Sequence, residues 1–145
     1  MVLTKKEVRE MEDYRDIKIL VVDDMVSMQS LIAEVLRRMG FVKIAMAKDG
    51  ADGLKKAKQL NFDLIISDWD MPTMDGLELL KAIRAESSIA QTPFLMLTAN
   101  ANKDKVMQAV RAKVNDYIAK PFQPVSLSEK INRLLRHKLQ QVAKI

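Results

Sequence analysis

The sequence predicts an α/β fold in which a five-stranded parallel sheet is covered by helices on both faces. Short aliphatic segments alternate five times with amphipathic helical patterns, which is the order expected of a parallel sheet. The aliphatic segment at residues 64–66 is too short for a surface helix and is typical of a strand buried on both faces. A chain of 145 residues also fits one domain with a core of ordinary size.

Composition excludes several classes of protein. Hydrophobic residues make up 48% and charged residues 30% of the chain, as in a globular protein rather than a disordered one. No apolar run is long enough to span a bilayer, and the amino terminus has no signal-peptide pattern, so we expect a cytoplasmic protein without membrane insertion. The absence of cysteine excludes disulfides and thiolate metal sites, and a single histidine argues against a histidine-based metal cluster.

A charged segment at residues 1–16 precedes the domain, which we place at residues 17–145. Thr4 and Glu7 have the spacing of a capping box, and apolar residues recur three apart, so a short helix is expected over residues 4–16. The segment is therefore predicted to be an N-terminal extension of the domain.

The first half of the domain follows the strand–helix alternation. Residues 17–22 are the first strand, and apolar residues at helical spacing predict a helix that ends near Met39, with Gly40 at its C-cap. Residues 43–47 alternate in polarity as a half-buried edge strand should, and a second helix is expected over residues 51–60.

The second half repeats the alternation three times. The last helix keeps one apolar face almost to the carboxyl terminus, through Leu139 and Val142, and Pro124 suits its first turn. The strands are expected to begin near Leu64, Phe94 and Tyr117, and the helices near Gly76, Lys103 and Pro124.

Polar side chains follow four of the five strands. Asp23 and Asp24 follow the first strand, Asp68 the third, Thr98 the fourth and Lys120 the fifth. Open α/β sheets bind their ligands outside the carboxyl ends of the strands, so we expect these five residues to form one site.

The residue types at this site suit a phosphoryl group. Neighbouring carboxylates raise one another's pKa unless a cation neutralises them, and Mg²⁺ is usually held by one or two carboxylates together with water and phosphate. Lys120 adds a positive charge and Thr98 a hydrogen-bond donor. Aspartate can accept a phosphoryl group, and Asp68, at the end of the central strand, is the best candidate acceptor.

Six short motifs surround these residues within residues 17–140: Val21-Val22-Asp23-Asp24, Ser67-Asp68-Trp69 with Met71-Pro72, Met74-Asp75-Gly76, Leu97-Thr98-Ala99, Tyr117, and Lys120-Pro121-Phe122. Together they resemble the motifs of receiver domains in two-component signalling, and within that family those of the stand-alone chemotaxis regulators. The resemblance implies a flavodoxin-like (βα)5 fold with strand order 2-1-3-4-5. It also implies a phosphorylation-activated response regulator, which is a signalling switch with Mg²⁺-dependent self-phosphorylation and autodephosphorylation rather than an enzyme.

The resemblance assigns a role to each site residue. Asp68 would be the phosphoacceptor, and Lys120 would contact the phosphoryl group. Asp24 and Asp68 would bind Mg²⁺ directly, together with the main-chain carbonyl of Asp70, and Asp23 would position a metal-bound water. Trp69 is expected at the rim of the site.

The resemblance further implies a switch and an output face. Thr98 would move toward the phosphoryl group and Tyr117 would change rotamer with it, while the Lys120–Pro121 peptide would be cis. The phosphodonor would be a histidine kinase or a small acyl phosphate, and the target a protein such as the flagellar motor switch, in chemotaxis or motility signalling. The candidate partner contacts are Val106, Tyr117, Lys130 and Arg133.

Nucleic acid is not an expected partner. The formal net charge is +5, and residues 128–145 carry five basic groups against one acidic group. This basic helix has neither interleaved aromatic residues nor a helix-turn-helix pattern, so a protein-binding face is favoured.

Three residues depart from the family pattern. Asp70 stands where the chemotaxis regulators usually have Asn, and Asn100 replaces a residue that is commonly acidic, so both bear on the lifetime of the phosphoryl group. Lys113 replaces the Gly that usually follows the fourth helix of the domain, so we expect that turn to be remodelled.

Other functions remain as alternatives. The chain could be the receiver part of a longer regulator whose output domain is missing, or a constitutive adaptor with an inactive site. The Asp68-Trp69-Asp70 motif also suits a haloacid-dehalogenase-like phosphatase, although Asp23-Asp24 and Lys120-Pro121 argue against that class.

Overall fold

Five parallel strands form a single sheet in the order β2-β1-β3-β4-β5, which confirms the predicted order. The computed structural model describes residues 2–143, apart from the side chains of residues 9–13, 137 and 139–143, so the apolar positions expected at Leu139 and Val142 lie outside the described residues. The elements along the chain are α1 (Lys5–Asp16), β1 (Lys18–Val22), α2 (Val26–Met39), β2 (Lys43–Ala47), α3 (Gly50–Gln59), β3 (Leu64–Asp68), α4 (Gly76–Ala85), β4 (Phe94–Thr98), α5 (Lys103–Arg111), β5 (Asp116–Ala119) and α6 (Pro124–Ala143).

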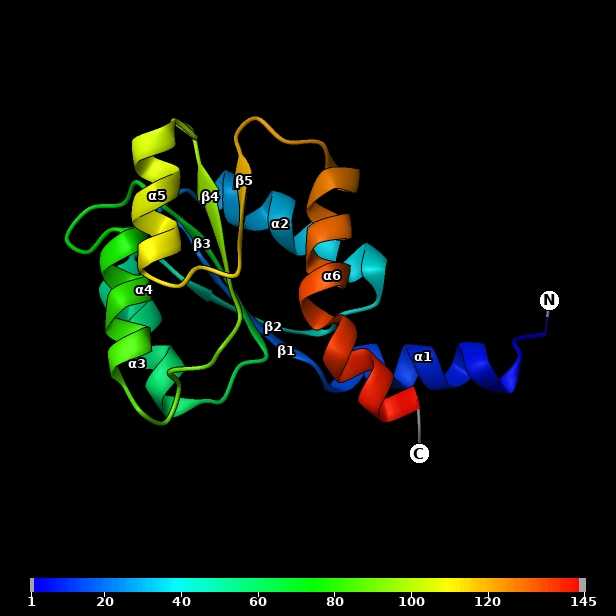
Figure 1. The fold of residues 1–145 in the computed structure, drawn as a ribbon. Coiled ribbons are helices and arrows are strands. Elements are labelled where there is room, and N and C mark those ends of the chain that lie inside the picture. The colour runs from blue at the N-terminus through cyan, green and yellow to red at the C-terminus, as the bar shows by residue number, and fades with distance from the viewer. Residues whose placement is uncertain (1, 144–145) are drawn as a thin grey trace.

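Helices cover both faces of the sheet, as predicted. Helices α2 and α6 lie on one face, and α3, α4 and α5 lie on the other (Figure 1). Alternate residues of each strand point to opposite faces, so Ile19 and Val21 belong to the core under α2 and α6, while Leu20 and Val22 belong to the core under α3 and α4. None of the described helices combines the length and apolar character needed to cross a membrane.

The central strand β3 is buried along its whole length. The side chains of Leu64, Ile65 and Ile66 are fully buried, and each contributes roughly 2 kcal/mol of hydrophobic stabilisation. The strand continues through Asp68 instead of ending just before it, because Asp68 pairs with Leu97 of β4. This extra residue brings a carboxylate to the edge of a rigid sheet.

Helix α1 begins with the predicted capping box, in which the Thr4 hydroxyl accepts from the Glu7 N–H and the Glu7 carboxylate accepts from the Thr4 N–H. The carboxyl end of α1 is attached to the domain, where the Tyr14 ring meets the Phe41 ring edge-on with 4.9 Å between their centroids. The amino-terminal part of α1 projects away from the sheet (Figure 1).

Two predictions about the strands were wrong in detail. The first strand starts at Lys18 rather than at residue 17, because Ile17 is the C-cap of α1. Strand β2 lies at an edge as predicted, but its burial does not alternate, since Ile44 through Met46 are all half-buried. Gly40 ends α2 with a φ of 107°, as its predicted C-cap role requires.

The turn after α5 keeps the usual left-handed geometry, contrary to the expected remodelling. Lys113 itself adopts a φ of 67° in the position where a glycine is usual. The Lys113 N–H donates to the Val110 carbonyl and the Val114 N–H to the Ala109 carbonyl, both at 3.0 Å. These two bonds satisfy carbonyl groups at the end of the helix and offset part of the conformational cost of a left-handed lysine.

Arg84 of α4 binds this turn through several hydrogen bonds. Its Nε and Nη2 atoms donate to the Lys113 carbonyl at 3.1 and 3.0 Å, and Nη2 also donates to Oδ1 of Asn115 at 2.8 Å. Its Nη1 atom donates to the carbonyls of Ala90 and Thr92 at 3.1 and 2.7 Å. One half-buried guanidinium therefore joins α4, the loop before β4 and the turn before β5.

Candidate functional site

The predicted site residues meet at the carboxyl edge of the sheet. One carboxylate oxygen from each of Asp23, Asp24 and Asp68 lies within 4.8 Å of the other two. Thr98 pairs with Ala119 at the end of β5, so Lys120 follows directly at the same edge. We name Asp23, Asp24 and Asp68 the acid cluster.

Lys120 reaches into the acid cluster. Its Nζ atom lies 2.8 Å from Oδ1 of Asp68 and 3.8 Å from Oδ2 of Asp23. The Lys120 N–H donates to the Thr98 carbonyl at 2.7 Å, and the Lys120–Pro121 peptide is cis, as expected. The hydrogen bond to Thr98 holds the Lys120 backbone at the edge of the sheet.

The loop after β3 folds closely around Asp68. The Trp69 N–H donates to Oδ1 of Asp68 at 2.9 Å, so this oxygen accepts from both Trp69 and Lys120. A Cβ atom on Gly76 would lie 2.3 Å from the Asp68 carbonyl oxygen, which explains why the first residue of α4 is glycine. Within the loop, Thr73 has a φ of 70° and the Met74 N–H bonds back across it, in a strained γ-turn.

Asp23 is the most deeply buried acid of the cluster. Its Oδ1 atom accepts from the Met25 N–H at 2.9 Å, whereas Oδ2 is buried without a hydrogen bond. Burial raises the pKa of Asp23, the Met25 N–H and Lys120 oppose the rise, and the charges of Asp68 and Asp24 add to it.

The acid cluster fits a divalent cation. Three carboxylates converge, and the buried Oδ2 of Asp23 has no hydrogen bond, although a buried polar atom normally makes one. Hard oxygen ligands of this kind suit Mg²⁺. Asp23 and Asp68 are buried and Asp24 is exposed, so the cluster has one side open to solvent. Asp70 is also exposed, and its carboxylate does not belong to the cluster.

The contacts given below for the two expected switch residues, Thr98 and Tyr117, are with residues other than Asp68. The buried Thr98 hydroxyl donates to the Asn100 carbonyl at 3.0 Å and accepts from the Asn100 N–H at 3.1 Å. Tyr117 is half-buried on the edge strand β5, and the Lys130 ammonium lies 5.8 Å from the centroid of its ring. Val106 of α5 is half-buried as well.

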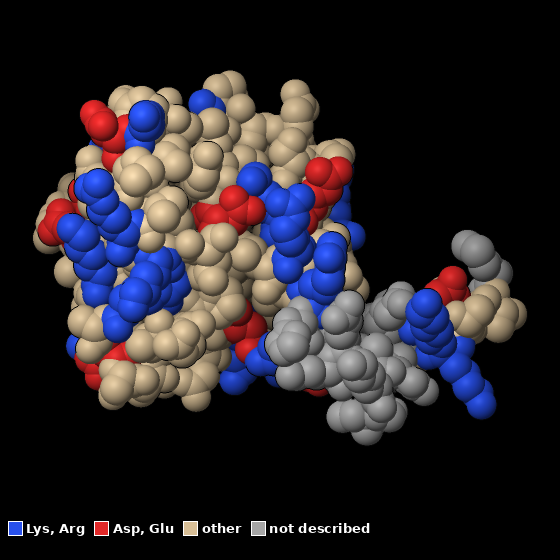
Figure 2. Space-filling model, viewed as in Figure 1, with Lys and Arg blue, Asp and Glu red and all other residues tan. Residues whose placement is uncertain are grey.

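Basic side chains gather over α5 and α6 on either side of β5 (Figure 2). Two of the expected partner contacts, Lys130 and Arg133, both face Asp116, with nitrogen–oxygen distances of 3.0 and 3.8 Å. Asp116 therefore neutralises part of the basic charge next to Tyr117.

Trp69 is not at the rim of the site, contrary to expectation. It is 3% exposed and packs in the core under α3 and α4. The Lys105 ammonium lies 4.6 Å from the centroid of its ring, in a cation–π contact between α5 and the residue next to Asp68. Sequence patterns do not indicate this contact, because it joins α5 to a loop residue far away in the chain.

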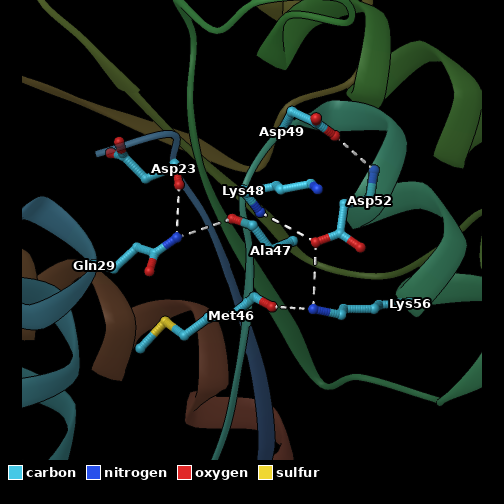
Figure 3. Close-up of polar contacts among 8 residues, drawn as sticks. All are labelled: Asp23, Gln29, Met46, Ala47, Lys48, Asp49, Asp52 and Lys56. Atoms are coloured by element: carbon cyan, nitrogen blue, oxygen red, sulfur yellow. Dashed lines mark hydrogen bonds and ion pairs between the residues drawn. The ribbon is translucent and has the colours of Figure 1, made fainter. Parts of the chain in front are cut away.

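Sequence patterns also do not single out Gln29, whose side-chain amide donates to the Asp23 carbonyl (Figure 3). The only signal in the sequence is a polar residue in the first turn of α2, which is common on solvated helix faces.

Known proteins are similar to this chain in both sequence and fold. The profile of the response regulator receiver domain matches residues 19–132. The chemotaxis protein CheY of Pseudomonas aeruginosa is 43% identical over 117 residues, which are 81% of this chain and 94% of that protein. The structure of chemotaxis protein CheY4 of Vibrio cholerae superimposes with a TM-score of 0.77 at 36% identity, over 82% of this chain and 98% of that one.

A third similar structure was solved with a bound metal ion. The receiver domain of a Pseudomonas aeruginosa sensor histidine kinase, solved with a magnesium ion coordinated in its active-site cleft, is 31% identical with a TM-score of 0.74. The alignment covers 81% of this chain and 96% of that one. The profile match and the two chemotaxis relatives establish the family. The chain belongs to the response regulator receiver domain family.

Proposed function

We propose that this chain is a phosphorylation-activated response regulator that takes a phosphoryl group from a histidine kinase onto Asp68. The observation that carries the proposal is the Lys120 ammonium 2.8 Å from Oδ1 of Asp68, beside the buried Asp23 carboxylate. A carboxylate, a lysine and neighbouring acids at one sheet edge can accept a phosphoryl group and stabilise its charge.

In the proposed reaction, a carboxylate oxygen of Asp68 attacks the phosphorus of a phosphohistidine or small acyl phosphate. A phosphorus–oxygen bond to Asp68 forms, the bond to the donor breaks, and the leaving group keeps its electron pair. The Lys120 ammonium is positioned to neutralise charge on the phosphoryl oxygens. Bound Mg²⁺, held by Asp24, Asp68 and the Asp70 carbonyl, with Asp23 holding a water, would supply further positive charge.

The phosphoryl group would then be lost by hydrolysis. Water attacks the phosphorus, the bond to Asp68 breaks, and inorganic phosphate leaves as the carboxylate is restored. The cycle of self-phosphorylation and autodephosphorylation makes the protein a timed switch rather than an enzyme that turns over an external substrate.

The output would be a change at the face made by α5, β5 and α6. The Thr98 hydroxyl would leave the Asn100 carbonyl and donate to the phosphoryl group, and Tyr117 would follow with a new rotamer. Val106, Tyr117, Lys130 and Arg133 would then contact the target. Two chemotaxis proteins among the relatives support a role in chemotaxis or motility. We further propose that the protein acts in the cytoplasm and that its target is a protein such as the flagellar motor switch.

Acetyl phosphate tests the acceptor. The wild-type protein should gain one phosphoryl group in intact-mass spectra when Mg²⁺ is present, and hydroxylamine should remove it because acyl phosphates react with that nucleophile. The Asp68→Asn variant should gain none. Asp70→Asn, which removes an exposed carboxylate two residues away, is the matched control and should still be phosphorylated.

Phosphorylation of the Asp68→Asn variant to the wild-type level, or a wild-type adduct that resists hydroxylamine, would contradict the proposal. Turnover of free phosphomonoesters by the wild type would instead revive the phosphatase alternative. Swimming behaviour of cells that carry only the Asp68→Asn allele tests the role in chemotaxis.

A further inference from the structure

Gln29 lies in the first turn of α2 and extends its side chain toward the end of β1 (Figure 3). Its Nε2 atom donates to the Asp23 carbonyl at 2.7 Å and to the Ala47 carbonyl at 3.3 Å. One half-buried amide therefore links α2 to the carboxyl ends of both β1 and β2.

This contact completes the restraint of the Asp23 main chain. The Asp23 N–H donates to the Ala47 carbonyl at 3.0 Å, and the Asp23 Oδ1 atom accepts from the Met25 N–H at 2.9 Å. With its carbonyl bonded to Gln29, Asp23 has both backbone groups and one carboxylate oxygen held, and only Oδ2 is left for the acid cluster.

The contact between Gln29 and the Asp23 carbonyl also restrains the backbone of Asp24. The Asp23 carbonyl and the Asp24 N–H belong to one planar peptide group, so fixing that carbonyl also fixes the direction in which the chain enters Asp24. Asp24 is exposed, and the N-cap residue of α2, Met25, makes no side-chain cap. Gln29 thus orients the peptide that connects two of the three acids of the cluster.

The second acceptor of Gln29 is itself firmly held. The carbonyl of Met46 accepts from Nζ of Lys56, and the Lys48 N–H donates to Oδ2 of Asp52 at 3.2 Å, so both neighbours of Ala47 are tied to α3 (Figure 3). Lys56 and Asp52 also pair with each other at 3.3 Å. Gln29 therefore joins the acid cluster to a rigid anchor rather than to a loose loop.

We propose that Gln29 is a positioning residue for the Mg²⁺ site, an inference that rests on the proposed function. Without its two hydrogen bonds, the repulsion among Asp23, Asp24 and Asp68 would turn the Asp23–Asp24 peptide outward. Partners that orient metal ligands typically change metal affinity 10- to 100-fold. Because Gln29 acts through the backbone, we expect a loss of about tenfold in Mg²⁺ affinity when its donor is removed.

The test compares Gln29→Met with Gln59→Met. The first substitution removes the amide and nearly keeps the side-chain length, and the second makes the same change at an exposed position on α3. Mg²⁺ alone is titrated by the fluorescence of Trp69, which is the only tryptophan in the chain. Calorimetry provides a second measure of the affinity.

A second readout is independent of metal. In metal-free protein, hydrogen exchange at the Met25 amide reports whether the Asp23 carboxylate keeps its bond to that N–H. Gln29→Met should speed this exchange about tenfold and leave the amides of β3 unchanged, whereas a general loss of stability would speed exchange throughout the core.

The outcomes distinguish the role of Gln29 from the proposed function of the protein. Equal Mg²⁺ affinity and equal Met25 exchange in Gln29→Met and wild type would overturn the role of Gln29. So would losses of the same size in Gln59→Met. Absence of Mg²⁺ binding in the wild type would contradict the proposed function itself, while faster Met25 exchange in Gln29→Met would still establish that the amide orients Asp23.

Discussion

The ammonium group of Lys120 lies 2.8 Å from Oδ1 of Asp68, and the same nitrogen lies 3.8 Å from the unbonded Oδ2 of Asp23. A single cation thus stands between two buried carboxylates. In metal-free protein, this lysine is the nearest positive charge that the described residues offer to the acid cluster. Its removal should therefore affect stability as well as chemistry.

Lys120→Met should lower the free energy of unfolding of metal-free protein by about 3 kcal/mol at neutral pH, because it leaves two neighbouring buried carboxylates unpaired. Urea unfolding measures the change. Lys43→Met is the control, since the Lys43–Asp16 pair is exposed and should contribute less than about 1 kcal/mol. Equal effects of the two substitutions would show that Lys120 does not neutralise the cluster.

The raised pKa of Asp23 predicts how stability depends on pH. The folded protein holds the Asp23 proton more tightly than the unfolded chain, whose carboxyl has the ordinary value of 3.8. The stability of metal-free protein should therefore fall as pH rises from about 3.8 through the raised pKa, and should remain lowered at neutral pH. Other groups also titrate, so the contribution of Asp23 is the difference between wild type and Asp23→Asn.

That difference should vanish at acidic pH and grow in favour of Asp23→Asn as pH rises, because the amide carries no charge to bury. Urea midpoints measured in the presence of a chelator test this. Added Mg²⁺ should reverse the order at neutral pH by stabilising wild type alone. A constant difference at every pH would contradict the assignment of the buried charge to Asp23.

Lys113→Gly should stabilise the protein by about 0.5–1 kcal/mol, because glycine adopts the φ of 67° found at this position without the steric cost that a lysine side chain has. The neighbouring Ala112 has a φ of −82°, so Ala112→Gly should instead destabilise by a similar amount. Thermal or urea unfolding distinguishes the two signs, and a loss of stability in Lys113→Gly would mean that its side chain makes compensating contacts.

Asp70→Asn should speed phosphorylation by acetyl phosphate a few-fold at low ionic strength, because an exposed carboxylate two residues from Asp68 repels an anionic donor. The gain should shrink at high salt, where exposed charges are screened. Asp16→Asn, at the end of α1 beside the amino end of β1, is the control and should leave the rate unchanged. A salt-independent gain would indicate a steric effect instead.

Much of the site followed from strand periodicity. Asp23, Asp68 and Lys120 each come at or directly after the end of a strand, and in a parallel sheet those ends lie at one edge. Their convergence therefore needed only the correct strand boundaries and the strand order. The acid cluster and the approach of Lys120 to it are the result.

The remaining features depend on contacts that no local pattern records. Gln29 donates to carbonyls of two strands, and Lys105 covers Trp69 across two elements, so both require the folded geometry. Lys113 has a left-handed backbone because the helix end and Arg84 hold it there, although lysine has no preference for that conformation. In each case tertiary contacts override the preference of the residue itself.

The hydrogen bonds made by Arg84 have a mechanical consequence for the proposed output face. They hold the carboxyl end of α5 through Lys113, while the amino end of α5 is reached through the short loop that contains Asn100, which is bonded to Thr98. A helix fastened at one end behaves as a lever with its pivot there. In the proposed switch, a displacement that begins at Thr98 would therefore move Lys103 and Val106 farther than Arg111, so the amino end of α5 would change most for a partner that binds there.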